Sequence, residues 1–93
     1  MYTIEFSSRA QKSLRKYKHS GTFPKEKFKT ALFCLKEGKP LPLSYKDHGL
    51  KSSLQEYREF HLAGDLLVLY ETDVMLKIVT IAKIGTHTEL FGS

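Results

Sequence analysis

Alternation of apolar and polar residues opens the chain. In residues 2–6 an apolar or aromatic side chain occupies every second position, which is the period of a half-buried strand. From Ser8 to Lys18 the apolar positions instead recur every three or four residues. Ser8 and Gln11 have the spacing of a capping box at the start of that stretch. The pattern predicts a strand followed by a helix over Ser8–Lys18.

A second helical pattern follows between Pro24 and Gly38. Thr22 and Pro24 are start signals, because proline in the first turn loses an N–H that has no partner there. Gly38 and Pro40 are stop signals. The predicted buried stripe consists of Phe28, Ala31, Leu32 and Leu35. The short connection predicts that the two helices pack as an antiparallel pair.

Three β-rich segments occupy the second half of the chain, after a predicted loop over residues 41–53. The predicted strands cover residues 54–62, 66–71 and 74–84, joined at 63–65 and 72–73. Joints of this length favour hairpins, and hence an antiparallel meander. The last strand is apolar on both faces, which is typical of a central strand. A short turn is expected over residues 86–91.

These elements predict an α+β fold with the order β-α-α-β-β-β. The helix pair packs on a small, twisted, mainly antiparallel sheet. At 93 residues, the chain is expected to form a single domain over 1–93.

Net charge, cysteine count and the lengths of the apolar runs limit the classes of function that fit the sequence. Fifteen Lys and Arg against ten Asp and Glu give a net charge of +5, so the surface attracts nucleic acid or an acidic partner. One cysteine, Cys34, forms neither an intrachain disulfide nor a Cys-rich zinc site, and its mid-helix position favours a buried thiol. The longest apolar run, Leu66–Tyr70, is far shorter than the roughly 20 residues of a membrane span. We expect a cytoplasmic protein without membrane contact.

Candidate chemistry lies at the ends of the predicted elements. His48, His61 and His87 each lie at or near such an end, accompanied by Asp65 and Lys83. Imidazoles titrate near neutrality and an ammonium keeps its charge, so the set suits general acid–base catalysis with a stabilised anion. A single exposed histidine is more often only solvated. Zinc binding is disfavoured because no His-x-x-x-His pair is present.

Cationic and aromatic residues indicate a second class of function, RNA binding without catalysis. Lys46, Lys51 and Arg58 lie near the loop and the second predicted strand, and five basic residues mark the polar face of the first helix. Such a run is as often only a solvated helix face. A non-catalytic RNA- or ribosome-binding module therefore remains the alternative, although it needs no histidines grouped with a carboxylate.

Three motifs carry a resemblance to a known family. Residues 45–50 read YKDHGL, residues 57–61 read YREFH, and residues 85–92 read GTHTELFG, with Asp65 before an apolar strand. In sequence and spacing these resemble the YafQ branch of the RelE toxins, messenger-RNA endoribonucleases of bacterial toxin–antitoxin pairs. The first half of the chain shares only the order of elements.

The resemblance implies a set of functional positions. His48, His61, Asp65, His87 and Phe91 match the family motifs, whereas two positions depart from them. Lys83 stands where the relatives usually carry Arg, and Leu66 stands where an aromatic often follows the Asp. Loss of a guanidinium removes bidentate phosphate geometry, and loss of the aromatic removes a stacking surface.

The activity implied is metal-independent cleavage of mRNA, commonly on the ribosome, with no cofactor. An antitoxin with an acidic tail is expected to hold the toxin silent. In this reading His87 is the acid, His48 or His61 is the base, and Asp65 orients a histidine or serves as base. Lys83 and Arg58 stabilise the phosphate, Lys46 and Lys51 bind the RNA backbone, and Phe91 stacks on a base.

Overall fold

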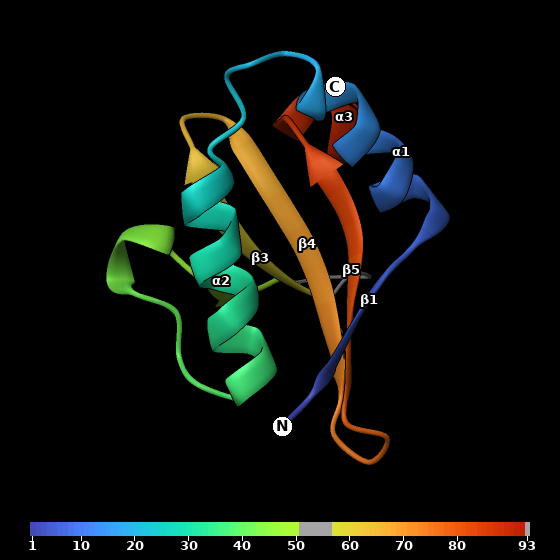
Figure 1. The fold of residues 1–93 in the computed structure, drawn as a ribbon, viewed down its shortest axis with the longest axis vertical. Helices are drawn as coiled ribbons and strands as arrows, with labels where there is room; N and C mark the ends of the chain where they lie inside the picture. Colours follow the sequence, from blue (N-terminus) through green and yellow to red (C-terminus); the bar gives the residue numbers. More distant parts are fainter. Residues whose placement is uncertain (51–56, 93) are drawn as a thin grey trace.

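The computed structural model describes residues 1–50 and 57–92 (Figure 1). The elements are, in order, β1 (Thr3–Phe6), α1 (Ser8–Lys18), α2 (Lys25–Glu37), the 3₁₀ turn η1 (Leu43–Tyr45), β2 (His48–Gly49), β3 (Arg58–Ala63), β4 (Leu66–Asp73), β5 (Ile78–Gly85) and α3 (His87–Phe91). Their order confirms the predicted β-α-α-β-β-β plan. The structure adds a short strand, β2, and a short terminal helix, α3.

The five strands form one sheet in the order β1-β5-β4-β3-β2. β3, β4 and β5 make the predicted antiparallel meander. β1 pairs with β5 in parallel, with Ile4 opposite Val79, so the sheet is mixed. The expected central position of the last strand is therefore confirmed, since β5 lies between β1 and β4.

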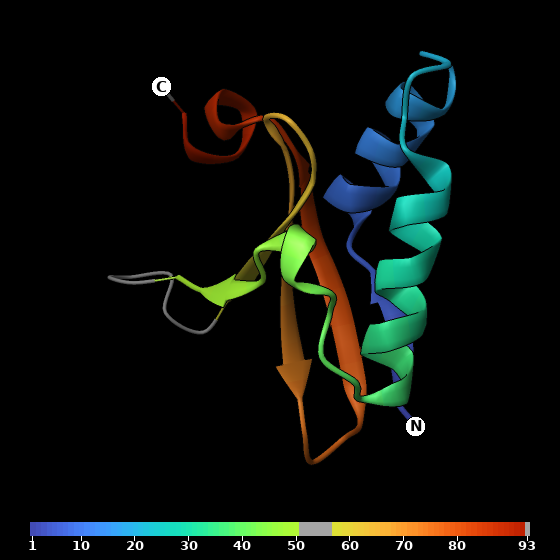
Figure 2. The ribbon, with the colours of Figure 1, turned by 90° about the vertical axis from the view of Figure 1, so that its left-hand side faces the viewer.

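The helices lie on both faces of the sheet. Figure 2 shows α1 and α2 running in opposite directions along one face, while α3 lies on the other side. The main core fills the first face, and its fully buried members include Ala10, Ala31, Phe60 and Leu62. A smaller cluster on the second face consists of Leu67, Leu69 and Leu90, with Leu50 packed against it. The described part of the chain thus covers the second face only partly, which leaves room for a site.

The start of α1 differs in one detail from the prediction. The helix has the expected bounds, but Ser7 is the N-cap, and its side chain accepts a hydrogen bond from the Ala10 amide. Gln11 donates to the Phe6 carbonyl and forms no capping box with Ser8. Ser7 has the extended backbone (φ −63°, ψ 162°) that a cap requires, so the predicted cap at Ser8 is wrong by one residue.

The β4–β5 hairpin corrects a strand boundary. β4 continues through Thr72 and Asp73, which were predicted to be the joint, and β5 begins only at Ile78. The turn is instead formed by residues 74–77, where the Asp73 carboxylate accepts from the Leu76 amide at 2.9 Å and Lys77 has φ 59°. An exposed apolar turn, Val74-Met75-Leu76, was therefore misread as the start of a strand.

The remaining boundaries also shift slightly. Within the predicted loop over 41–53, the structure shows η1 and β2, and residues 51–53 lie outside the described residues. So does the predicted start of the next strand at residues 54–56, and β3 is seen from Arg58. The predicted tail turn is the helix α3, which begins with a complete capping box between Thr86 and Glu89.

Candidate active site

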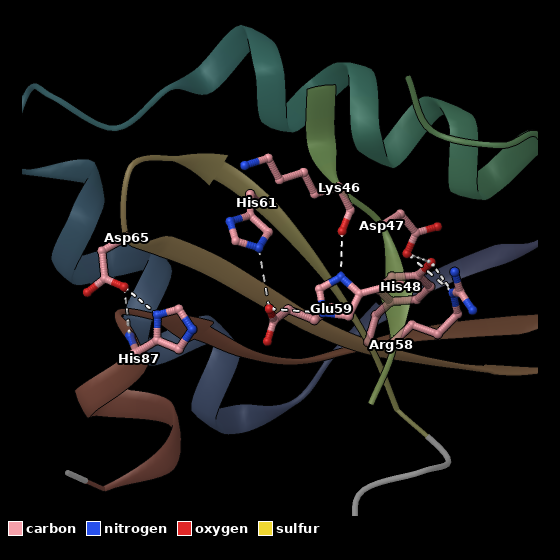
Figure 3. A network of polar contacts seen from close by, with 9 residues as sticks. Lys46, Asp47, His48, Arg58, Glu59, His61, Asp65 and His87 are labelled. Atoms are coloured by element: carbon pink, nitrogen blue, oxygen red, sulfur yellow. Dashed lines mark hydrogen bonds and ion pairs between the residues drawn. The ribbon is translucent and has the colours of Figure 1, made fainter. Parts of the chain in front are cut away.

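Successive side chains of β3 point to opposite faces of the sheet, so that alternate residues face the core and the candidate site. Phe60 and Leu62 are fully buried in the main core, so the alternate residues, Glu59 and His61, face the opposite side of the sheet. His48 on β2 lies opposite Glu59 in the register. Strand pairing therefore brings together two histidines that are 13 positions apart in sequence, with a carboxylate between them (Figure 3).

The cluster His48–Glu59–His61 has a defined geometry. Both imidazole Nε2 atoms lie 3.5 Å from Glu59 Oε1, and the two rings are 6.1 Å apart between centroids. The Glu59 side chain is 6% exposed, against 50% for His48 and 25% for His61. His48 Nδ1 lies 2.6 Å from the Lys46 carbonyl oxygen, and because a carbonyl only accepts, Nδ1 carries the proton.

Glu59 is the functional candidate that sequence reasoning missed. It is the one buried charged residue among those described. A signal was present, because Glu59 and His61 are two residues apart in a predicted strand and must share a face. The burial of a carboxylate is unfavourable unless it is partnered, so its position between two imidazoles indicates function.

Asp65 and His87 form a second pair on this face. Asp65 lies in the turn between β3 and β4, and His87 is the first residue of α3. Asp65 Oδ1 lies 2.5 Å from His87 Nδ1 and also accepts from the His87 amide at 3.4 Å. These bonds hold the pKa of the Asp65 carboxyl below its usual range, chiefly through the His87 side chain. The Phe91 ring lies 5.9 Å from the His87 ring.

Glu89 anchors the helix that carries His87. Its carboxylate accepts from Lys16 Nζ at 2.8 Å, from Tyr17 Oη at 2.7 Å and from the Thr86 amide at 2.9 Å. The bond from Lys16, then those from Thr86 and Tyr17, lower the pKa of Glu89 to about 2. A Cβ at Gly85 would lie 2.7 Å from Glu89 Oε1, so a larger residue there would displace the Glu89 carboxylate. α3 is therefore tied to α1.

Lys83 occupies the same cross-strand row as Glu59. The register runs from Glu59 to Leu69 and on to Lys83, which places the lysine two strands away from the histidine cluster. It lines a cleft between α1 and α3 with other basic side chains. The cleft residues are Arg9, Lys12, Ser13, Lys16, Lys83, Ile84, Glu89 and Leu90. Part of the basic face of α1 therefore adjoins α3.

Arg58 lies apart from the histidines. It alternates with Glu59 along β3 and pairs with Tyr70, a residue of the main core. Its Nε lies 3.3 Å from both Asp47 Oδ1 and Tyr70 Oη, and Tyr70 donates to Asp47 at 2.8 Å. Arg58 therefore takes part in a structural hydrogen-bond network with Asp47 and Tyr70. Its expected contact with phosphate stays a prediction.

The other predicted residues have simpler positions. Lys46 is exposed in the left-handed conformation (φ 52°), beside the histidines in Figure 3. Lys51 lies outside the described residues. Cys34 is partly buried in α2. No helix within residues 1–50 and 57–92 has the length and apolar character of a membrane span.

The cluster also has the composition of a metal site. The ligand atoms of His48, Glu59 and His61 all lie within 4.8 Å of one another. The absence of a His-x-x-x-His pair argued against metal in the sequence, but that argument covers only ligands on one helix. Here a sheet supplies them from two strands.

Comparison with known proteins gives one matching family. The family model described as "Bacterial toxin of type II toxin-antitoxin system, YafQ" matches residues 2–92. The mRNA interferase toxin YafQ of Escherichia coli (strain B / BL21-DE3) is 44% identical over 54 residues, which are 57% of this chain and 55% of that protein. The alignment thus spans about half the length of this curated relative.

Two solved structures extend the similarity to nearly the whole chain. The metal-bound toxin from Helicobacter pylori has 35% identity and a TM-score of 0.87, covering 98% of this chain and all of that one. YafQ in the E. coli DinJ–YafQ complex has 32% identity and a TM-score of 0.82, covering 99% and 100%. With the family match over residues 2–92, these similarities show that the chain belongs to the YafQ family of bacterial type II toxin–antitoxin toxins.

Proposed function

We propose that this chain is an mRNA endoribonuclease, the toxin of a type II toxin–antitoxin pair. The observation that carries the proposal is the Asp65–His87 pair, set beside Phe91 on the sheet face that also holds His48, Glu59 and His61. The names of the related E. coli proteins, mRNA interferase toxins, support it. The site supplies both an acid and a base without a cofactor.

His87 fits the role of general acid. The Asp65 carboxylate accepts a hydrogen bond from His87 Nδ1–H, so Nε2 is left to donate a proton to the substrate. The side chains of both residues are 57% exposed, so RNA can reach them. Phe91 is 40% exposed. Its ring offers a face on which an RNA base stacks next to the proposed acid.

His48 fits the role of general base better than His61. Its Nδ1 proton is engaged by the Lys46 carbonyl, which leaves an unprotonated Nε2 in the neutral ring. His61 lies on the other side of the same Glu59 oxygen. Glu59 stabilises whichever imidazole takes up a proton.

The reaction follows from these positions. The base removes the proton of the RNA 2′-OH, and the 2′-oxygen forms a bond to the adjacent phosphorus. The bond from phosphorus to the 5′-oxygen breaks, and His87 protonates that oxygen. The products are a 2′,3′-cyclic phosphate and a 5′-hydroxyl. Lys83 stabilises the charge on the phosphorane, while Lys46 contacts the RNA backbone.

The proposed partners are an mRNA on the ribosome and an antitoxin with an acidic tail, met in the cytoplasm. E. coli YafQ has been crystallised in DinJ–YafQ complexes, which supports a protein antitoxin. A net charge of +5 suits both RNA and an acidic chain. The related H. pylori toxin has been crystallised in a metal-bound form. In this chain the His48–Glu59–His61 cluster, which the cleavage steps above use as base, has the composition of a metal site.

Expression of the chain alone in a bacterium tests the function. We expect growth arrest and new 5′ ends in a translated mRNA, mapped by primer extension. His87→Ala should lower cleavage by about 10²- to 10⁴-fold, the contribution of a general acid. His19→Ala is the matched control, because this exposed histidine caps α1 far from the site in sequence.

Two outcomes would contradict the proposal. A folded wild-type chain that arrests growth without any mRNA cleavage would favour the non-catalytic ribosome-binding alternative. A folded His87→Ala chain that cleaves at the wild-type rate would remove His87 from the mechanism.

A further inference from the structure

The environment of Glu59 is unusual for a carboxylate in a hydrogen-bonded site. Among residues 1–50 and 57–92, its partners are two imidazole Nε2 atoms, each 3.5 Å from the same oxygen. Charge-assisted N–H···O bonds are shorter, about 2.7–2.9 Å. His48 is moreover held with its proton on Nδ1, so the neutral ring turns a lone pair toward the carboxylate. A cation bound between these atoms would account for both the long nitrogen–oxygen distances and the lone pair that faces the carboxylate.

The spacing fits a tetrahedral metal. Zinc binds histidine nitrogen and carboxylate oxygen at about 2.0–2.2 Å, which places two tetrahedral ligand atoms about 3.3 Å apart. Both nitrogen–oxygen distances here are 3.5 Å, and all three ligand atoms lie within 4.8 Å of one another. A small approach of the two rings completes the geometry.

Resting on the proposed ribonuclease function, we propose that His48, Glu59 and His61 form a Zn²⁺ site whose occupation inhibits RNA cleavage. The bound ion takes the Nε2 lone pairs that otherwise remove the 2′-OH proton. The bound metal therefore inhibits the toxin. Removal of the ion restores the base.

The surroundings support such a site. The Lys46 carbonyl holds the His48 Nδ1 proton, an outer contact that is typical of metal-bound histidines. Two imidazoles with one carboxylate suit Zn²⁺ or Cu²⁺ better than Mg²⁺ or Ca²⁺, which prefer all-oxygen ligands. His48 is half exposed, so an ion can enter, while the buried Glu59 provides the compensating charge.

Calorimetry with Zn²⁺ on the metal-free chain tests the site directly. We expect one ion bound per chain at about micromolar affinity or tighter, and a rise in melting temperature on loading. Glu59→Gln and His48→Ala should each weaken binding by at least about 100-fold. His48 is exposed, so its variant removes a ligand even where the change at the buried Glu59 disturbs folding. His19→Ala should bind zinc like the wild type.

Cleavage assays then test inhibition. Zn²⁺ should stop RNA cleavage by the wild type at the concentrations that fill the calorimetric site, and a chelator should restore it. Absence of stoichiometric binding, or equal affinity in wild type and His48→Ala, overturns the site. A cleavage rate that is unchanged or raised at full occupancy overturns the inhibitory role. A metal-free chain that never cleaves RNA overturns the ribonuclease function and its inhibition, while calorimetry still decides the metal site.

Discussion

At the residue scale, chemistry depends on small local constraints. A carbonyl oxygen at Lys46 fixes the His48 tautomer, and a carboxylate at Asp65 fixes that of His87. Both rings therefore direct Nε2 away from the bond that fixes them. In the proposed mechanism His48 uses this atom to accept a proton and His87 uses it to donate one. Neither constraint requires burial, since the His48 and His87 side chains are at least half exposed.

Lys83 gives the residue-scale prediction. An ammonium neutralises a phosphorane oxygen as a point charge but cannot bind two oxygens as a guanidinium does. Lys83→Arg should therefore keep or raise cleavage, and Lys83→Ala should lower it by about 10²-fold or more. Rates on a translated mRNA, with folding checked by circular dichroism, measure the ranking.

Lys12→Ala is the matched control for Lys83, because Lys12 lines the same cleft from α1. We expect this control to weaken RNA binding with little change in the cleavage rate of bound RNA. Equal rates for Lys83→Ala and the wild type would leave Lys83 as a solvated residue near the end of β5.

At the element scale, the placement of α3 decides where His87 lies. A helix of five residues is too short to be stable alone. It is held by the capping box, by Leu90 packed on Leu67 and Leu69, and by the bonds from Glu89 to α1. The GTHTELFG motif therefore encodes an anchored helix as well as the histidine proposed as general acid.

The anchor predicts a pH-dependent stability. Glu89 has an ordinary pKa of 4.5 that the fold lowers to about 2, so its stabilising contacts are complete above pH 4.5 and lost as the pH falls toward 2. Glu89→Gln should thus melt below the wild type at pH 7, with a gap that narrows toward pH 2. The gap should be modest because the Glu89 side chain is 39% exposed.

Thermal unfolding of both chains between pH 2 and 7 measures this gap. Glu5→Gln is the matched control, an exposed carboxylate on β1. A gap between wild type and Glu89→Gln that stays constant over the whole range would show that the substitution acts through packing and not through charge.

The same scale explains how far the sequence could predict the structure. Helix α1 and the meander followed from clear periodicities, since their apolar faces are buried against one another. The hairpin at Val74-Met75-Leu76 did not follow, because three apolar residues in an exposed turn imitate a strand. The motifs identified His48, His61, Asp65 and His87. Strand period alone places Glu59 on the face of His61, but its position opposite His48 comes from the pairing of β2 with β3, which local patterns do not specify.

At the scale of the whole molecule, charge and topology act together. The basic cleft between α1 and α3 contains Arg9, Lys12, Lys16 and Lys83, and its wall is the helix that carries His87. RNA bound along this cleft would therefore continue to the face that carries the proposed catalytic residues. This arrangement places part of the excess positive charge of the chain, +5 in all, along a cleft beside α3.

The final prediction tests whether the cleft between α1 and α3 guides RNA to His87. Each phosphate contact contributes about 0.7 to the slope of log affinity against log salt for single-stranded nucleic acid. The double variant Arg9→Ala/Lys12→Ala should therefore lower the slope by about 1.4 and weaken binding at low salt. Lys25→Ala/Lys29→Ala removes the same charge from α2, on the other side of α1, and should leave the slope nearly unchanged. Filter binding of a short mRNA to cleavage-inactive His87→Ala chains, over a range of salt, measures both. Equal slopes in the two double variants would mean that RNA responds to net charge alone, and that the cleft does not guide it to His87.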